Sequence, residues 1–407
     1  GSLVVVGFAG IALNILIVRY YGSGTLGAFG QVFAVLMIAG QVAVGGFVFG
    51  ILHYLPRSEA AGSERHAIFV SALYATVGLA AAVAVAMWFL SDIFGGVVGS
   101  PATGAGLKLA SPAVFLFAIN KVLLFALNAQ RAMRLFAVGQ MLRMLFYVFG
   151  MLILIAIRAD GVVLPLSLTI GEFLLTGFLI TATRRHFSFS PKMFDRAWVI
   201  RLVKYGRDGF FIGLLFDINL KVDVIMLGLF LNDAAVGLYV FMAMFADGFA
   251  QLPVVLQNNL NPLLSRTLHE KPIGSIRTYL VPLHLYFVPV MGLLAGIATL
   301  IVPELAVVLT GDSTYRDAWP IFAILAAGIA ITSGFSPLLF VLNQAGRPDL
   351  QTALLAMSLV FNLVGNAILI SIFGLFGAAV ATSFATVLSV PTLILLYKRA
   401  TQRWLWS

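Results

Sequence analysis

Long apolar runs are the feature of this sequence that most constrains its fold. A helix that crosses the hydrocarbon core of a membrane needs about 20 mostly apolar residues, whereas a strand of a membrane barrel needs about ten residues of alternating character. The chain contains twelve continuous runs of the longer kind, and we therefore predict an all-α polytopic membrane protein with twelve transmembrane helices. The runs cover roughly residues 1–18, 27–52, 67–90, 109–130, 135–157, 162–183, 209–231, 235–262, 279–302, 319–343, 350–373 and 376–397.

The composition supports this prediction. Hydrophobic residues make up 61% of the 407 positions and charged residues 10%, against about 45–50% and about 25% in an ordinary soluble domain. Too few polar side chains are therefore available to cover a surface that faces water. The chain also contains no cysteine, which excludes disulfides, thiol catalysis and cysteine-ligated metal centres.

The positions of the basic residues predict the orientation of the helices. Of the 25 lysines and arginines, 18 fall in the even-numbered connections and the C-terminal tail, 4 in the odd-numbered connections and 3 inside the predicted helices. Because lysine and arginine concentrate in cytoplasmic loops, both termini should lie in the cytoplasm. The net charge of +9 then reflects topology, and we expect no nucleic acid as a partner.

Two halves of the chain resemble each other. The segment Leu339–Asn343 repeats Leu124–Asn128 at an offset of 215 residues. Six helices per half make a parallel repeat, which is typical of alternating-access transporters, whose substrate sites lie between the halves. We therefore predict two pseudo-symmetric six-helix lobes. The expected domains are an N-terminal lobe at 1–183, a basic cytoplasmic linker at 184–208, a C-terminal lobe at 209–397 and a cytoplasmic tail at 398–407.

The linker carries its own pattern. Phe194, Trp198, Leu202 and Tyr205 fall on one arc of a helical wheel, an arrangement that favours an amphipathic helix lying on the inner membrane surface. A plain solvated linker is the alternative.

Charged side chains inside the predicted helices are the candidate functional residues. Each would cost about 2.5–3.5 kcal/mol at the centre of a helix that faces lipid, so we expect them to face a protein interior or a water-filled cavity. They either pair to hold helices together or line a polar cleft. The seven are Lys121, Arg143, Glu172, Asp217, Lys221, Asp223 and Asp247.

Their chemistry divides these residues by role. Lys121, Arg143 and Lys221 would form a cationic cleft that binds an anion such as a phosphate. Burial raises the proton affinity of a carboxylate, which makes Glu172 and Asp247 candidates for coupling transport to a proton or another cation.

The remaining candidates are structural or gate residues. Asp217 and Lys221 lie four residues apart on one helix face and can neutralise each other. Asp223 lies nearer the end of its predicted helix, and Arg19 and Arg57 lie at helix ends, where we expect interface anchors or gates.

Three short motifs resemble those of a known family. Val18–Phe29 is similar to the signature that follows the first helix of polysaccharide transporters, and Tyr54–Arg57 resembles the close of their second helix. Asp223–Gly228 with Val236–Tyr239 is similar to their helix seven to eight signature. On these motifs the chain resembles the Wzx-type O-antigen flippases of the multidrug/oligosaccharidyl-lipid/polysaccharide (MOP) superfamily.

The resemblance implies a MATE-like flippase fold and an activity. Such a protein would move a polyprenyl-diphosphate-linked oligosaccharide from the cytoplasmic to the outer leaflet of the bacterial inner membrane by alternating access. Its partners would be this lipid-linked cargo, membrane lipids and other polysaccharide-assembly proteins, with no cofactor and with coupling to a proton or sodium gradient. The alternatives are a MATE-type cation-coupled drug antiporter and a membrane-embedded oligosaccharide polymerase or ligase. Short outer connections without histidine disfavour an enzyme.

Overall fold

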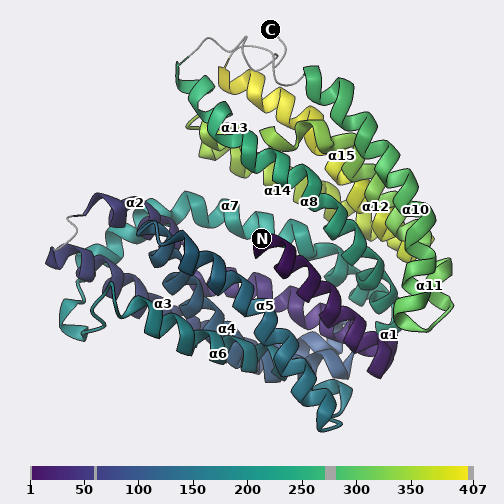
Figure 1. Cartoon of the computed structure of the whole chain (residues 1–407), viewed down its shortest axis with the longest axis horizontal. Helices are drawn as coiled ribbons and strands as arrows, with labels where there is room; N and C mark the ends of the chain where they lie inside the picture. The colour runs from purple at the N-terminus through teal and green to yellow at the C-terminus, as the bar shows by residue number, and fades with distance from the viewer. Residues whose placement is uncertain (1, 59–61, 271–280, 402–407) are drawn as a thin grey trace. The chain divides into compact units, whose positions relative to one another are not determined.

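The described residues form helices joined by short turns. The computed structural model describes residues 2–58, 62–270 and 281–401, and no strand occurs among them (Figure 1). The predicted start of the ninth transmembrane helix, at 279, lies outside these residues, as does the tail from 402 onward. The all-α prediction is therefore confirmed for the described part of the chain.

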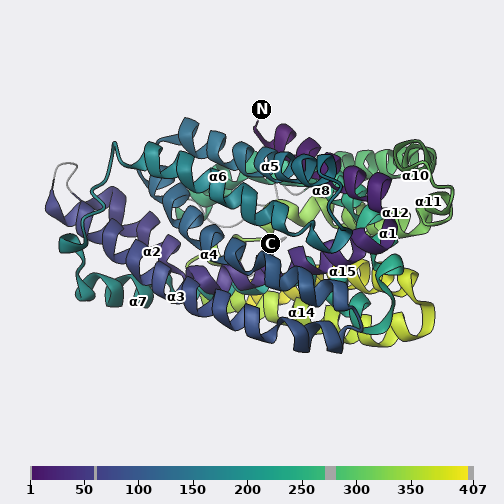
Figure 2. The ribbon, with the colours of Figure 1, turned by 90° about the horizontal axis from the view of Figure 1, so that it is seen from below.

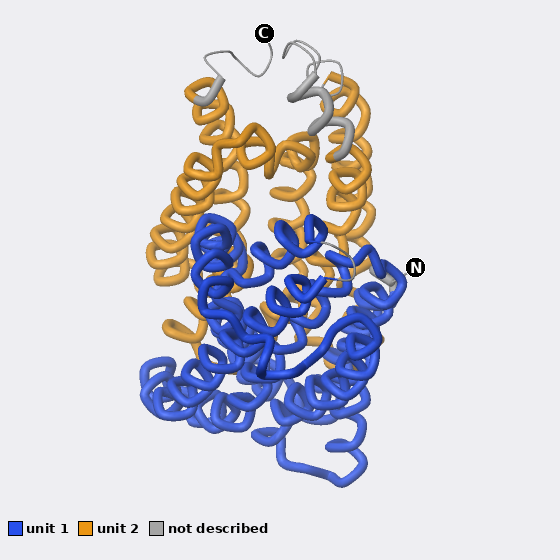
Figure 3. Tube along the Cα trace, turned by 90° about the vertical axis from the view of Figure 1, so that its left-hand side faces the viewer, with its two compact units in different colours: residues 1–217 blue, residues 218–407 orange. Residues whose placement is uncertain are grey.

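The chain divides into two compact units, residues 1–217 and 218–407 (Figure 3). Helix α7 belongs to both, because the boundary falls inside it. The helices that begin in unit 1 are α1 (Ser2–Val44), α2 (Phe47–Tyr54), η1 (Leu55–Arg57), α3 (Ser63–Val97), α4 (Pro101–Ala129), α5 (Met133–Ala156), η2 (Gly161–Val163), α6 (Leu166–Thr183), η3 (Pro191–Met193) and α7 (Arg196–Phe230). The remainder are α8 (Asp233–Glu270), η5 (Leu283–Phe287), α10 (Val288–Thr310), α11 (Thr314–Asp317), α12 (Trp319–Thr332), η6 (Ser333–Leu338), α13 (Val341–Gln344), α14 (Pro348–Phe373) and α15 (Leu375–Thr401).

Helix α1 contains the first predicted membrane helix and most of the second, which continues into α2. Its 43 residues would extend about 65 Å as one straight helix, roughly twice the hydrocarbon thickness. Gly22 breaks the helix with φ +83° and ψ 177°, a conformation that residues with a Cβ rarely adopt. The chain doubles back at this point (Figure 1).

Ten helical segments of the described chain are long and apolar enough to cross a membrane. The segment Val5–Val44 is one of the ten, although it holds the first predicted pass and most of the second. Helix α7 supplies the seventh predicted pass, and its charges at Asp217, Lys221 and Asp223 make it less apolar than the ten. With these two additions the helices account for the twelve predicted passes.

Helix α4 is the centre of unit 1. It contacts α1, α3, α5 and α6, and small residues bring these neighbours close. A Cβ on Gly40 of α1 would lie 2.6 Å from the ring of Phe117 on α4. A Cβ on Gly171 of α6 would lie 2.4 Å from the ring of Tyr147 on α5. Large side chains therefore occupy space that glycines leave open, around the same part of α4.

Unit 2 is built in part from its last two long helices, α14 and α15. They pack so closely that a Cβ on Gly377 would lie 2.0 Å from the carbonyl oxygen of Leu369. A core cluster at one end of this pair includes the buried Leu342, Leu354 and Tyr397.

Half of the amphipathic arc of the predicted linker packs on protein. Only Pro191–Met193 forms a short 3₁₀ turn, and a continuous helix, α7, begins at Arg196. Trp198 and Leu202 are buried, and Leu202 contacts α2 at Gly50, where an added Cβ would lie 2.6 Å from the Leu202 side chain. Phe194 and Tyr205, the other two residues of the arc, are exposed. Helix α2, which lies beside the start of α7 (Figure 2), therefore covers only part of the arc, and a helix lying on the membrane surface stays a prediction.

Candidate functional site

Three of the predicted site residues meet in unit 1 around the ring of Phe117. Arg143 on α5 forms an ion pair with Glu172 on α6, with 3.0 Å between Nε and Oε1. The Arg143 guanidinium lies 4.7 Å from the centre of the Phe117 ring, and the Lys121 ammonium lies 5.6 Å from it. Both distances fall within the range of a cation–π interaction. Two cations thus flank one aromatic ring inside the unit.

Glu172 is fully buried and bonded at both carboxylate oxygens. Asn120 donates to Oε2 at 2.7 Å, and the Tyr147 hydroxyl donates to Oε1, the oxygen that also faces Arg143. The carboxylate therefore has one charged partner and two neutral hydrogen-bond donors. Glu172, predicted as a coupling residue, therefore has its charge balanced by Arg143.

Arg143 keeps unused hydrogen-bonding capacity. Its Nη2 atom is buried and has no hydrogen-bond partner among the described residues. Its Nη1 atom makes one long contact, 3.5 Å, to the amide oxygen of Gln140. Because a buried donor without a partner costs about 1–3 kcal/mol, this guanidinium is suited to receive a further acceptor.

Lys121 is partly buried and bonded to a neutral group. Its ammonium donates to the amide oxygen of Gln41 on α1 at 2.5 Å. Asp217, the last residue of unit 1, acts on it by electrostatic attraction and Arg143 by repulsion. An ammonium has three donors, so Gln41 leaves room for an anion. We refer to Gln41, Phe117, Asn120, Lys121, Arg143, Tyr147 and Glu172 as the unit-1 polar cluster.

The predicted residues of unit 2 form a separate group. Asp223 on α7 is buried, accepts from the Tyr239 hydroxyl at 2.5 Å and from the backbone N–H of Val224 at 2.8 Å. Lys221 acts electrostatically on both Asp223 and Asp247. Asp247 lies exposed on α8, unlike Glu172, its predicted counterpart.

The two arginines predicted as gates lie at helix ends. Arg19 is exposed near the end of the first half of α1. Arg57 is exposed on η1, and its Nη1 atom lies 2.9 Å from Nδ1 of His53. Neither belongs to the unit-1 polar cluster.

Sequence reasoning missed the uncharged members of both groups. Gln41, Asn120 and Tyr147 complete the unit-1 polar cluster, and Tyr239 holds Asp223. The only signal for them in the sequence is a polar side chain within an apolar run, which is weak because such residues are frequent. A cluster of three or more histidine, aspartate or glutamate side chains that could hold a metal ion does not occur among the described residues.

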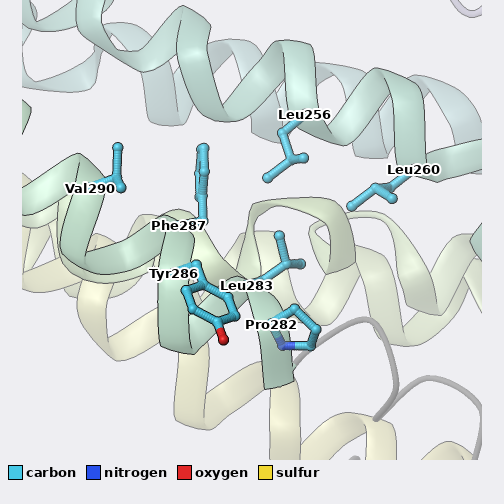
Figure 4. Close-up of a pocket in the computed structure, with 7 residues that line it drawn as sticks. All are labelled: Leu256, Leu260, Pro282, Leu283, Tyr286, Phe287 and Val290. Carbon is cyan, nitrogen blue, oxygen red and sulfur yellow. The ribbon is translucent and has the colours of Figure 1, made fainter.

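Unit 2 also contains an apolar pocket of about 460 Å³ between α8 and the η5–α10 segment (Figure 4). Leu256 and Leu260 line it from α8, and Phe287 and Val290 line it from the other side. Its lining suits hydrocarbon and excludes a charged head group.

Comparison with solved structures identifies the fold. The lipid II flippase MurJ in its inward closed conformation matches with a TM-score of 0.80, 14% identity and coverage of 98% of this chain and 86% of that chain. An inward-facing multidrug resistance MATE transporter of the MOP superfamily matches with a TM-score of 0.73, 14% identity and coverage of 97% and 94%. A MOP superfamily transporter from Pyrococcus furiosus, described as having a binding pocket of reversed polarity, matches with a TM-score of 0.65, 13% identity and coverage of 98% and 93%. The chain therefore has the MOP flippase fold, and these matched proteins are flippases and transporters.

Sequence comparison adds little to this result. No protein-family model matches the chain. An uncharacterized membrane protein of Methanocaldococcus jannaschii is 34% identical over 82 residues, which are 20% of this chain and 16% of that protein.

Proposed function

We propose that this protein is a Wzx-type flippase that moves a polyprenyl-diphosphate-linked oligosaccharide across the bacterial inner membrane, from the cytoplasmic to the outer leaflet, by alternating access. The MOP flippase fold supports the class of activity. The unit-1 polar cluster supports the class of cargo. The observation that supports this is the buried Nη2 atom of Arg143, which has no hydrogen-bond partner among the described residues. It belongs to a guanidinium that shares the Phe117 ring with Lys121.

The cargo explains why a membrane protein would hold such a cluster. Moving charged phosphates and sugars through hydrocarbon without compensation costs tens of kcal/mol. A guanidinium supplies fixed charge with several donors, and an ammonium supplies a compact positive charge. Arg143 and Lys121 together would replace the water that the diphosphate leaves.

The cationic cluster argues against a drug antiporter. A cationic drug would meet repulsion from Lys121 and Arg143 at the Phe117 ring. Its natural binding site would instead be acidic and aromatic. We therefore favour an anionic cargo, although MATE transporters share the fold.

Asp247 is the better candidate for coupling to an ion gradient. Glu172 is buried and paired with Arg143, so protonating it would break a buried ion pair. Asp247 is exposed, so a coupling ion can reach it without breaking the Arg143–Glu172 ion pair. We assign coupling to Asp247 and a structural role to Glu172.

Lys121→Ala tests the proposed cargo site. We expect translocation of a fluorescent polyprenyl-diphosphate sugar in proteoliposomes to fall about 10- to 100-fold, the equivalent of one lost hydrogen bond to a charged group. Lys121→Arg should retain most of the activity because the charge remains. Lys108→Ala is the matched control, because Lys108 pairs with Asp92 on an exposed surface. Normal translocation by Lys121→Ala, in protein present at wild-type levels, would contradict the proposal.

A further inference from the structure

A second group of aromatic and basic side chains lies on the surface of unit 1, apart from the unit-1 polar cluster. The His53 ring stacks on Tyr205 with 3.8 Å between centres and 24° between planes. Tyr54 meets Tyr205 and Trp198 edge-on at 5.6 and 5.4 Å. We call these four rings, from α2 and the start of α7, the aromatic shelf.

Two guanidinium groups border this shelf. Arg57 lies against His53, with Nη1 2.9 Å from the ring nitrogen Nδ1. The Arg201 guanidinium lies 4.8 Å above the Trp198 ring. Both arginines are exposed, and neither forms an ion pair with a carboxylate among the described residues. Their charge is therefore available to a ligand.

Glycines hold the shelf in a fixed position. A Cβ on Gly206 would lie 2.3 Å from the carbonyl oxygen of Gly46, and a Cβ on Gly46 would lie 2.7 Å from the carbonyl oxygen of Gly206. Phe49 fills the space beside Gly209 in the same way. Backbone contact between α2 and α7 therefore sets the spacing of rings that come from two different helices (Figure 2).

We propose that the aromatic shelf with Arg57 and Arg201 is a loading site that binds the sugar-diphosphate head group of the lipid-linked cargo before it reaches the unit-1 polar cluster. This proposal rests on the proposed function. The arginines would hold the two phosphates, and the exposed face of Tyr205 would contact the first sugar. The charge distribution of the sequence predicts that this end of unit 1 faces the cytoplasm, where such a cargo is made available.

The chemistry of the shelf matches this ligand better than it matches a bare anion. Guanidinium groups form paired hydrogen bonds with phosphate oxygens. Aromatic rings offer an apolar face to the C–H groups of a sugar while keeping a polar edge in water. An inorganic phosphate would use only the arginines, and the four rings beside them would have no role in its binding.

Binding measurements on the full chain test the loading site. The protein is placed in nanodiscs of neutral phosphatidylcholine and titrated with undecaprenyl-diphosphate-N-acetylglucosamine, with undecaprenyl diphosphate and with inorganic pyrophosphate. We expect Arg57→Ala and Arg201→Ala each to lower the affinity of the protein for both lipid probes about tenfold. We expect Tyr205→Ala to lower the affinity for the glycosylated probe alone, by about threefold.

Two controls separate this site from its neighbours. Arg196→Ala removes an exposed cation of α7 that lies over none of the shelf rings among the described residues, and it should bind like the wild type. Lys108→Ala, which removes a cation paired with Asp92, should bind and translocate like the wild type. If Lys121→Ala translocates normally but the shelf variants still lose binding, the proposed cargo site fails and the loading site stands.

The competing occupant is the membrane surface itself. If Arg57→Ala with Arg201→Ala binds the glycosylated probe as the wild type does, the loading site is overturned. It is equally overturned if these substitutions reduce only the binding of the protein's surface to anionic phosphatidylglycerol lipids and leave binding of the diphosphate probes unchanged. A loss of binding that is confined to the diphosphate probes supports the loading site.

Discussion

The two units bury a carboxylate in different ways. In unit 1 Glu172 has a cationic partner, Arg143, and two neutral donors, Asn120 and Tyr147. In unit 2 Asp223 has a hydroxyl and a backbone N–H as its hydrogen-bond donors. Glu172 thus makes a direct ion pair, whereas the described hydrogen-bond donors of Asp223 are neutral and Lys221 acts on it electrostatically. The comparison indicates that Glu172 depends on its hydroxyl donor less than Asp223 does.

Removing the cation should produce the largest effect. Arg143→Ala leaves Glu172 buried without its counter-charge, which typically costs 3–5 kcal/mol. We expect a large fall in the thermal midpoint of the detergent-solubilised protein. The double variant Arg143→Met with Glu172→Gln should recover most of that loss but not translocation. An Arg143→Ala midpoint close to the wild type would show that the ion pair does not hold unit 1 together.

Removing one hydroxyl from each unit sharpens the comparison. Tyr239→Phe takes away the one side-chain donor seen at Asp223 and should cost about 1–3 kcal/mol. Tyr147→Phe leaves Glu172 with Arg143 and Asn120 and should cost about 0.5–1.5 kcal/mol. Thermal unfolding of both variants under identical conditions measures the difference. A greater loss for Tyr147→Phe would contradict the inference that Glu172 depends less on its hydroxyl donor than Asp223 does.

Neutralising the exposed carboxylate should change transport more than stability. Asp247 is exposed, so Asp247→Asn should alter unfolding by no more than about 0.5 kcal/mol. We expect translocation by this variant to stop responding to an imposed proton or sodium gradient. Glu172→Gln provides the contrast, because it should lower stability. Gradient-dependent transport that survives Asp247→Asn would remove Asp247 from the coupling step.

The smallest expected effect is a pH response at the aromatic shelf. Partial burial and the nearby Arg57 lower the pKa of His53 below its ordinary value. The neutral form is therefore favoured in the folded protein, and its contribution to stability is present above about pH 6.5 and is lost as the pH falls through the folded pKa. We expect a small decrease in the thermal midpoint on acidification that His53→Gln abolishes. An identical decrease in His53→Gln would assign it to other groups.

The sequence predicts the positions of the helices better than the partners of their side chains. Apolar runs located α3 to α6, α10, α14 and α15 because each must span the same thickness. Arg143, Glu172 and Asp223 were also recognisable as interior groups, whereas Asp247 is exposed. The pairing of Arg143 with Glu172 was not, because the apolar pattern does not show which faces of α5 and α6 meet. The same reason hid Gln41, whose partner Lys121 lies 80 positions away.

The linker shows a different limit of the sequence pattern. Of the predicted membrane-facing arc, Trp198 and Leu202 are buried against protein, whereas Phe194 and Tyr205 are exposed. An arc of this kind does not distinguish between a lipid surface and another helix, because both bury apolar area. Gly46 and Gly50 decided the outcome, since they allow α2 to approach α7 to backbone contact.

The reversal of the chain at Gly22 is a suitable position for an inserted epitope. Its backbone leaves the helical region at φ +83°, and a Cβ added there would have no neighbour within 4 Å. Exposed tips of this kind are the positions at which chains best tolerate inserted segments. An antibody would detect a short epitope placed after Gly22 in either intact or permeabilised cells. The difference in labelling would show on which side of the membrane the first helical hairpin turns.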